Sequence, residues 1–114
     1  MPNGRTGGFP IEVTTLQRLL GAIASEAVLG HVITGPRQRT PAKASDIARL
    51  VDQCQEERVG VEEQHGDSYI IHLADEPALV WVEVERESPL FQDLRQLHRQ
   101  WTSVHPGWKG WIAF

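Results

Sequence analysis

The chain has 114 residues, of which 40% are hydrophobic and 23% are charged. A chain of this length can bury a core of its own, and this composition excludes an intrinsically disordered protein, so we expect a single folded domain. The formal net charge of −4 disfavours nucleic acid and anionic membranes as binding partners.

The N-terminal third of the sequence predicts a short strand, a long helix and a loop. The stretch FPIEV at 9–13 could form a first strand. Apolar residues then recur at helical spacing, which predicts a helix over 14–30 with Gly30 as its left-handed stop. The glycine and prolines of TGPRQRTPAK, residues 34–43, predict a surface loop.

A second helix is expected to follow this loop. Thr40 would cap it, and Pro41 would occupy its first position, where a backbone N–H is not needed. The end of this helix is predicted near Arg58. Its apolar stripe comprises Ala44, Ile47, Leu50 or Ala48, Val51 and Cys54.

The spacing of apolar residues changes after this helix from a helical period to a period of two. Runs at 58–64, 68–74 and 78–85 predict three consecutive strands, of which the first two form a hairpin. In the second run, one face consists of Tyr69, Ile71 and Leu73. In the third run, one face consists of Val80, Val82 and Val84, and the other of Leu79, Trp81, Glu83 and Glu85.

A third helix is predicted over 88–104, because Ser88 is a favourable N-cap and Pro89 a favourable first residue. Its apolar stripe consists of Leu90, Phe91, Leu94, Leu97 and Trp101. The sequence HPG at 105–107 ends the helix, and WKGWIAF at 108–114 could form a short last strand.

The predicted order of elements is therefore (β)ααβββα(β). Strands that follow one another along the chain pair antiparallel, and the helices must cover one face of their sheet. The expected fold class is α+β: a two-layer sandwich in which three helices pack on one face of a sheet of three to five mainly antiparallel strands. Residues 1–8 are expected to form a flexible N-terminus, and 9–114 the single domain.

Charge is distributed unevenly along the chain. Residues 52–93 hold 12 of the 15 acidic residues and the bases Arg58 and Arg86, so this segment carries −10 and the rest of the chain +6. Because the segment contains the three predicted strands, the sheet face that no helix covers should be acidic, with aromatic residues set in it. Aromatic anchors surrounded by charge are typical of protein-binding surfaces. In the alternative interpretation, acidic strand residues merely discourage edge-to-edge aggregation.

This charge pattern favours a small non-enzymatic binding protein that engages a basic protein partner, as inhibitor, immunity or adaptor proteins do. The residues predicted to bind the partner are Trp81, Glu83, Glu85, Tyr69, Glu62 and Glu63. A homodimer is also expected, because a small sheet with an apolar C-terminal segment has edges to cover.

The C-terminal sequence HPGWKGWIAF supports a second function. Its tryptophans could line a pocket for a small molecule, either in a binding protein or in a small enzyme. The candidate pocket residues are Trp101, Trp108, Trp111, His98, His105, Arg95 and Lys109. We favour the alternative that this tail packs in the core or between subunits, since burial is the commoner use of large aromatic side chains.

Other kinds of site have weaker support in the sequence. Arg37, Arg39 and Lys43 precede the predicted second helix, whose N-terminus could hold an anion. The five histidines lack the spacing of a zinc site, and no nucleophile or nucleotide-binding motif is present. We therefore predict no catalytic residue, no metal and no cofactor.

The expected location is the cytoplasm. The chain has one cysteine, Cys54, which excludes an internal disulfide and is typical of a reducing compartment. Its N-terminus has no apolar run like that of a signal peptide, and no stretch has the length of a membrane span.

Overall fold

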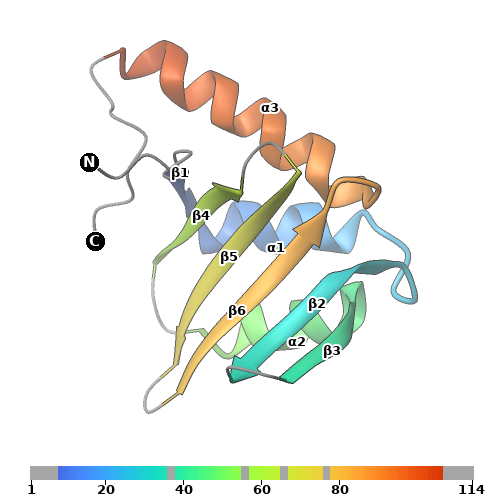
Figure 1. Ribbon diagram of the computed structural model, residues 1–114. Coiled ribbons are helices and arrows are strands. Elements are labelled where there is room, and N and C mark those ends of the chain that lie inside the picture. Colours follow the sequence, from blue (N-terminus) through green and yellow to red (C-terminus); the bar gives the residue numbers. More distant parts are fainter. Residues whose placement is uncertain (1–7, 36–37, 55–56, 65–66, 76–77, 107–114) are drawn as a thin grey trace.

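The computed structural model describes residues 8–35, 38–54, 57–64, 67–75 and 78–106. Along the chain these residues form β1 (Gly8–Glu12), α1 (Val13–Gly21), β2 (Val28–Gly35), β3 (Gln38–Lys43), α2 (Ala44–Asp52), β4 (Arg58–Gln64), β5 (Ser68–Asp75), β6 (Ala78–Glu85) and α3 (Pro89–Val104) (Figure 1). The fold class is α+β, as predicted, with three helices in the described part of the chain.

The six strands form one open sheet in the order β1-β4-β5-β6-β2-β3. Every neighbouring pair is antiparallel. The consecutive strands β4, β5 and β6 occupy the middle, while β1 lies on one side of them and the β2–β3 hairpin on the other (Figure 1). The sheet therefore exceeds the predicted three to five strands, because both strands of this hairpin went unrecognised in the sequence.

Both edge strands of the sheet contain a proline, Pro10 in β1 and Pro41 in β3. Proline lacks a backbone N–H, so it interrupts the row of donors that an edge strand would offer to a further strand. The described edges are thus poorly suited to pairing with another sheet.

The core lies on one face of the sheet. The alternation predicted for β5 is confirmed, since Tyr69, Ile71 and Leu73 are buried, and so are Val82 and Val84 on β6. The helices contribute Leu16 and Leu20 from α1, Ile47 and Val51 from α2, and Leu90, Phe91 and Leu94 from α3 to the same buried cluster. Helix α1 contacts α2, and α3 contacts β1, β5 and β6.

The prediction of a helix over 14–30 is wrong beyond its first half. Helix α1 ends at Gly21, and Val28–Gly35 is strand β2. Apolar residues continue by chance at helical spacing through 23–28, although the helix has already ended. Val28 is exposed, so these residues do not form a buried helical stripe. Valine and isoleucine in VLGHVITG instead suit a pleated, half-buried strand.

The prediction of a loop over 34–43 is also wrong, because Gln38–Lys43 is strand β3. Thr40 and Pro41 lie within that strand, so they neither cap nor open α2, which begins at Ala44. Most side chains of β3 are exposed, and a polar edge strand of this kind has no alternation to reveal it. Helix α2 ends at Asp52, earlier than predicted.

The remaining predictions of elements follow the structure closely. Strands β4 and β6 have the predicted bounds, β5 is one residue longer, and 9–13 differs from β1 by one residue at each end. Helix α3 is confirmed, and its cap is formed as expected by Ser88, whose Oγ accepts a hydrogen bond from the N–H of Phe91 at 3.3 Å. Residues 1–7 and the possible strand at 108–114 lie outside the described residues.

Candidate functional site

The face of the sheet opposite the core carries two rows of side chains that run across four strands. Residues that stand opposite each other in an antiparallel pair share a face. The first row consists of His72 on β5, Trp81 on β6, Ile33 on β2 and Arg39 on β3. The second row consists of Glu62 on β4, Ile70 on β5, Glu83 on β6 and His31 on β2. We call this surface the open face.

A groove of about 610 Å³ runs over the open face. Its centre is apolar, since Ile33, Ile70 and Trp81 line it, and its polar walls are Arg39, Glu62, Gln64, Asp67, Ser68, His72 and Glu83. Trp81 is 41% exposed, although an indole is among the most apolar surfaces that a side chain can offer. The described structure therefore leaves a large aromatic side chain in water at the centre of a polar face.

On the β4–β5 side of Trp81, a glutamate and a histidine are paired. Nε2 of His72 lies 3.0 Å from Oε1 of Glu62, and both side chains are partly buried. The His72 ring also meets the indole of Trp81 edge-on, with 6.0 Å between ring centroids and 67° between planes. This pair thus forms one flank of the groove, beside its aromatic centre.

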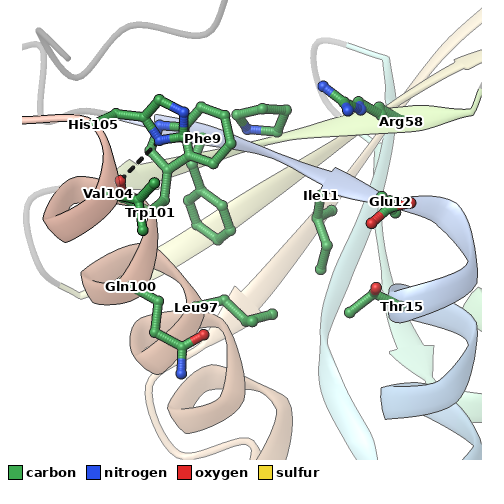
Figure 2. A pocket seen from close by; sticks show the side chains of 11 residues that line it. Phe9, Ile11, Glu12, Thr15, Arg58, Leu97, Gln100, Trp101, Val104 and His105 are labelled. Atoms are coloured by element: carbon green, nitrogen blue, oxygen red, sulfur yellow. Dashed lines mark hydrogen bonds between the residues drawn. The ribbon is translucent and has the colours of Figure 1, made fainter.

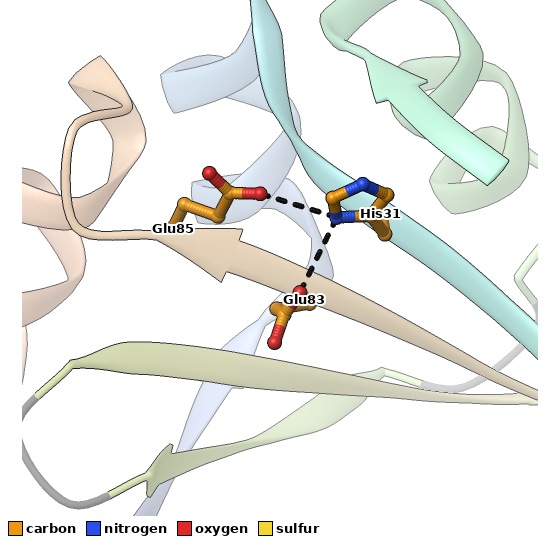
Figure 3. Close-up of side chains that lie close together, drawn as sticks. All are labelled: His31, Glu83 and Glu85. Atoms are coloured by element: carbon orange, nitrogen blue, oxygen red, sulfur yellow. Dashed lines mark ion pairs between the residues drawn. The ribbon is translucent and has the colours of Figure 1, made fainter. Parts of the chain in front are cut away.

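On the other side of Trp81, a histidine lies between two glutamates (Figure 3). Nδ1 of His31 is 3.1 Å from Oε1 of Glu85 and 3.4 Å from Oε1 of Glu83. The guanidinium of Arg39 contacts the same Glu83 oxygen. Two basic side chains, His31 and Arg39, therefore converge on the carboxylate of Glu83, which is itself mostly buried.

Among the described residues, His31, Glu83 and Glu85 are the one group whose ligand atoms lie close enough together for a metal ion. The Arg39 guanidinium already shares the Glu83 oxygen that the ion would need. A divalent cation there would face a permanently charged group at contact distance. We assign these residues to the acid–base network of the open face.

Four of the six residues predicted to bind a partner are brought together on this face: Trp81, Glu83, Glu85 and Glu62. The other two require a correction. Tyr69 is only 1% exposed and belongs to the core. Glu63 stands opposite Tyr69 in the β4–β5 register, so it shares the face of Tyr69, where α3 packs.

Behind the sheet, Tyr69 and His98 form an aromatic cluster with Phe9. The His98 ring stacks on Phe9 with 5.1 Å between centroids and 13° between planes, and its Nδ1 lies 3.3 Å from the Tyr69 hydroxyl. Burial, reinforced by the charge of Glu63, raises the pKa of Tyr69 to about 12. Burial lowers the pKa of His98, and Glu63 partly opposes that effect. His98, predicted as a pocket residue, is therefore a neutral packing partner of the core.

A second concavity of about 310 Å³ lies between α3, β1 and the start of α1 (Figure 2). Its apolar lining includes Phe9, Ile11, Leu97, Trp101 and Val104, and its polar lining includes Glu12, Thr15, Arg58, Gln100 and His105. The rings of Trp101 and His105 stack with 3.8 Å between centroids. We call this concavity the helix-side cleft.

The structure thus brings together two of the residues predicted for a tryptophan-lined pocket, Trp101 and His105. Arg95 is separate from them, because it is exposed on α3 among Gln92, Asp93, Gln96 and Arg99. Trp108, Lys109 and Trp111 lie outside the described residues.

The prediction of an anion site rested on a loop that leads into a helix N-terminus, and this premise is wrong. Arg39 and Lys43 belong to strand β3, and Arg39 contacts the carboxylate of Glu83 on the open face. Arg37 lies outside the described residues. The described cations of this segment therefore do not converge on an empty anion site.

Sequence reasoning missed several residues of the open face, most clearly His31, Ile33, Ile70 and His72. A signal existed for Ile70 and His72, because they alternate with the buried Tyr69, Ile71 and Leu73 along β5. No comparable signal existed for His31 and Ile33, since their segment reads as the end of a helix followed by a loop.

Comparisons with models of protein families, with curated proteins and with solved structures found no match for this chain. None of the described helices combines the length and apolar character that crossing a membrane requires.

Proposed function

We propose that the protein is a small non-enzymatic binding protein that captures a basic protein partner through its open face, in the manner of inhibitor, immunity or adaptor proteins. The observation that carries this proposal is Trp81, a 41% exposed indole at the centre of a groove with carboxylates on both sides. Tryptophan is among the residues that most often dominate binding energy at interfaces, particularly when polar groups surround it.

The charge of the open face supports a basic partner. Glu62, Asp67, Glu83 and Glu85 contribute −4 and Arg39 contributes +1, which gives −3 while both histidines are neutral. A field of one sign steers an oppositely charged partner toward the face and disfavours partners of the same sign.

The competing explanation, that strand acids merely prevent edge pairing, fits this sheet less well. Glu62 and Glu83 lie on β4 and β6, which have neighbours on both sides. Both edges already carry a proline. The central acids are therefore not needed as edge protection, and binding accounts for them better.

A second candidate function is favoured by the helix-side cleft, where Trp101 and His105 stack beside an apolar lining. A small molecule with a flat apolar body would fit there. The groove of the open face and the helix-side cleft share no lining residue, so a variant of one leaves the lining of the other unchanged. A cytoplasmic location and a homodimer remain predictions that accompany the main proposal.

The test is capture of binding proteins from a lysate of the source cells by the immobilised chain, compared across matched variants. We expect a basic protein to be retained at low salt and lost at high salt, because interactions between exposed charges are screened by ions. Retention should be abolished by Trp81→Ser and by the double variant Glu83→Lys/Glu85→Lys.

The matched control is Glu26→Lys/Asp52→Lys, which makes the same change of charge at two exposed positions outside the groove. Since Glu83 contacts His31 and Arg39, the milder Glu83→Gln/Glu85→Gln pair separates loss of binding from loss of folding. A partner retained equally by all variants, or no partner at all, would contradict the proposal.

A further inference from the structure

We infer that the open face recognises an arginine side chain of the partner, whose guanidinium stacks on the indole of Trp81 and pairs with the carboxylate of Glu62. This inference rests on the proposed function and names the chemical group at the centre of that interface.

The apolar centre of the groove favours cations that are weakly hydrated over cations that hold their water strongly. Around Trp81 the groove is lined by Ile33 and Ile70, and the His72 ring meets the indole edge-on. A lysine ammonium is strongly hydrated and would lose water against such a surface, whereas a guanidinium is planar, weakly hydrated and stacks on aromatic rings. The apolar centre therefore favours arginine.

Of the two glutamates that line the groove, Glu62 is the one better placed to take this charge. Glu83 is already compensated by Arg39, and its Oε1 is also close to His31. Among the described residues, the ion-pair partner of Glu62 is His72, which lies 3.0 Å from its Oε1, and no arginine or lysine pairs with it. Because no guanidinium or ammonium group of the described residues occupies Glu62, an incoming guanidinium gains a charge-assisted hydrogen bond there.

The open face already holds one guanidinium of its own. Arg39 extends from β3 to the carboxylate of Glu83, beside Ile33, and two strands separate it from Ile70 on β5. A partner arginine on Glu62 would repeat this arrangement on the other side of Trp81. The groove would then contain two arginine–glutamate pairs separated by the indole.

The experiment is titration of the ¹⁵N-labelled full chain with three blocked tripeptides, Gly-Arg-Gly, Gly-Lys-Gly and Gly-citrulline-Gly. Citrulline keeps the shape of arginine without its charge. The readout is the indole N–H signal of Trp81, assigned by its loss in Trp81→Phe. We expect the arginine peptide to shift this signal saturably. The lysine peptide should bind at least about threefold more weakly, and the citrulline peptide should not reach saturation.

Glu62→Gln and Glu63→Gln form a matched pair, because these neighbours make the same chemical change on opposite faces of β4. Glu62→Gln should weaken binding of the arginine peptide by about threefold or more, while Glu63→Gln should leave its affinity unchanged. The inference would be overturned if the arginine and lysine peptides bound with equal affinity, or if Glu62→Gln left the affinity for the arginine peptide unchanged. It would also be overturned if no peptide shifted the Trp81 signal.

These outcomes separate the inference from the function on which it rests. If capture of a protein depends on Trp81 while the arginine and lysine peptides bind alike, the open face binds a partner without selecting arginine. If capture is insensitive to variants of the open face and no peptide moves the Trp81 signal, both proposals fail together.

Discussion

At the scale of single residues, Gly30 holds a position in β2 that no other residue could take without displacing the neighbouring strand β6. Its φ is +156°, which is rare for residues with a side chain. A Cβ built there would lie 1.9 Å from the backbone oxygen of Glu83 on the neighbouring strand. The pairing register of β2 with β3 shifts beside this residue, so Gly30 lets the β2 backbone bend while it stays against β6.

Gly30→Ala should destabilise the protein by about 2–4 kcal/mol, because the methyl group must push β2 away from β6 and the backbone becomes strained. Urea unfolding followed by circular dichroism would measure this change. Gly21→Ala is the control, since no atom lies within 4 Å of the added Cβ at the exposed end of α1. That control should be neutral or stabilising by as much as about 1 kcal/mol. Equal stability of the two variants would contradict the close approach described for Gly30.

At the scale of elements, the three described helices differ in whether a side chain caps their first turn. Helices α1 and α2 follow Glu12 and Lys43, and neither residue forms a side-chain cap. Helix α3 begins with the Ser88 cap, and Ser88 is buried. The start of the longest helix is therefore fixed by a hydrogen bond that solvent cannot easily replace.

Ser88→Ala should lower the free energy of unfolding by about 1 kcal/mol, because the N–H of Phe91 loses its side-chain acceptor in a buried place. Thermal and urea unfolding would measure this loss. Ser103→Ala makes the same substitution at an exposed position in the last turn of α3, where it should cost almost nothing. If both variants unfolded alike, the cap would have no role in stability.

The elements that could be predicted from sequence are those that bury one face along their whole length. Strands β4, β5 and β6 alternate apolar and polar residues because one side of each packs on helices, and this alternation also placed Trp81, Glu83 and Glu85 on a common face. The hairpin β2–β3 buries little of its length, so its place in the sheet depends on the pairing of β2 with β6. No local pattern in the sequence predicts that pairing.

The same reason limits what the sequence could say of the site. The acids of the open face follow from alternation, but their basic partners do not. His31 and Arg39 reach Glu83 only because β2 pairs with β6, about 50 positions away in the chain, and β3 pairs with the other side of β2. No local period of the sequence predicts pairing at that separation. Tyr69 was misplaced because an aromatic residue near a glutamate suggests an interface as readily as a core.

At the scale of the whole molecule, the buried cluster behind the sheet makes stability depend on pH. Burial lowers the pKa of His98 below its ordinary value of 6.5, so the folded state holds fewer protons than the unfolded state once the pH falls below that value. The contribution of neutral His98 is therefore fully present above pH 6.5. It is lost as the pH falls through the lowered pKa of the folded protein.

We expect His98→Gln to flatten the dependence of the unfolding free energy on pH between about 7 and 5, whatever its effect on stability at pH 7. Urea unfolding at a series of pH values would measure the slope. The control is His105→Gln, which removes an exposed histidine from the end of the same helix. A His98→Gln slope equal to that of the unchanged protein would show that His98 is not the group responsible.

The strand order also has a consequence for how the chain acquires its fold during synthesis. Strand β1 pairs only with β4 in the described sheet, and β2 meets β6, so the N-terminal strands await partners that emerge from the ribosome later. The local pairs of β4, β5 and β6 involve short loops and can close early, whereas the distant pairs close slowly. The open face is then completed last, when β2 joins β6 and brings His31 and Arg39 to Glu83. A nascent or truncated chain that ends before residue 78 would lack Trp81 and Glu83, and with them the centre of the open face.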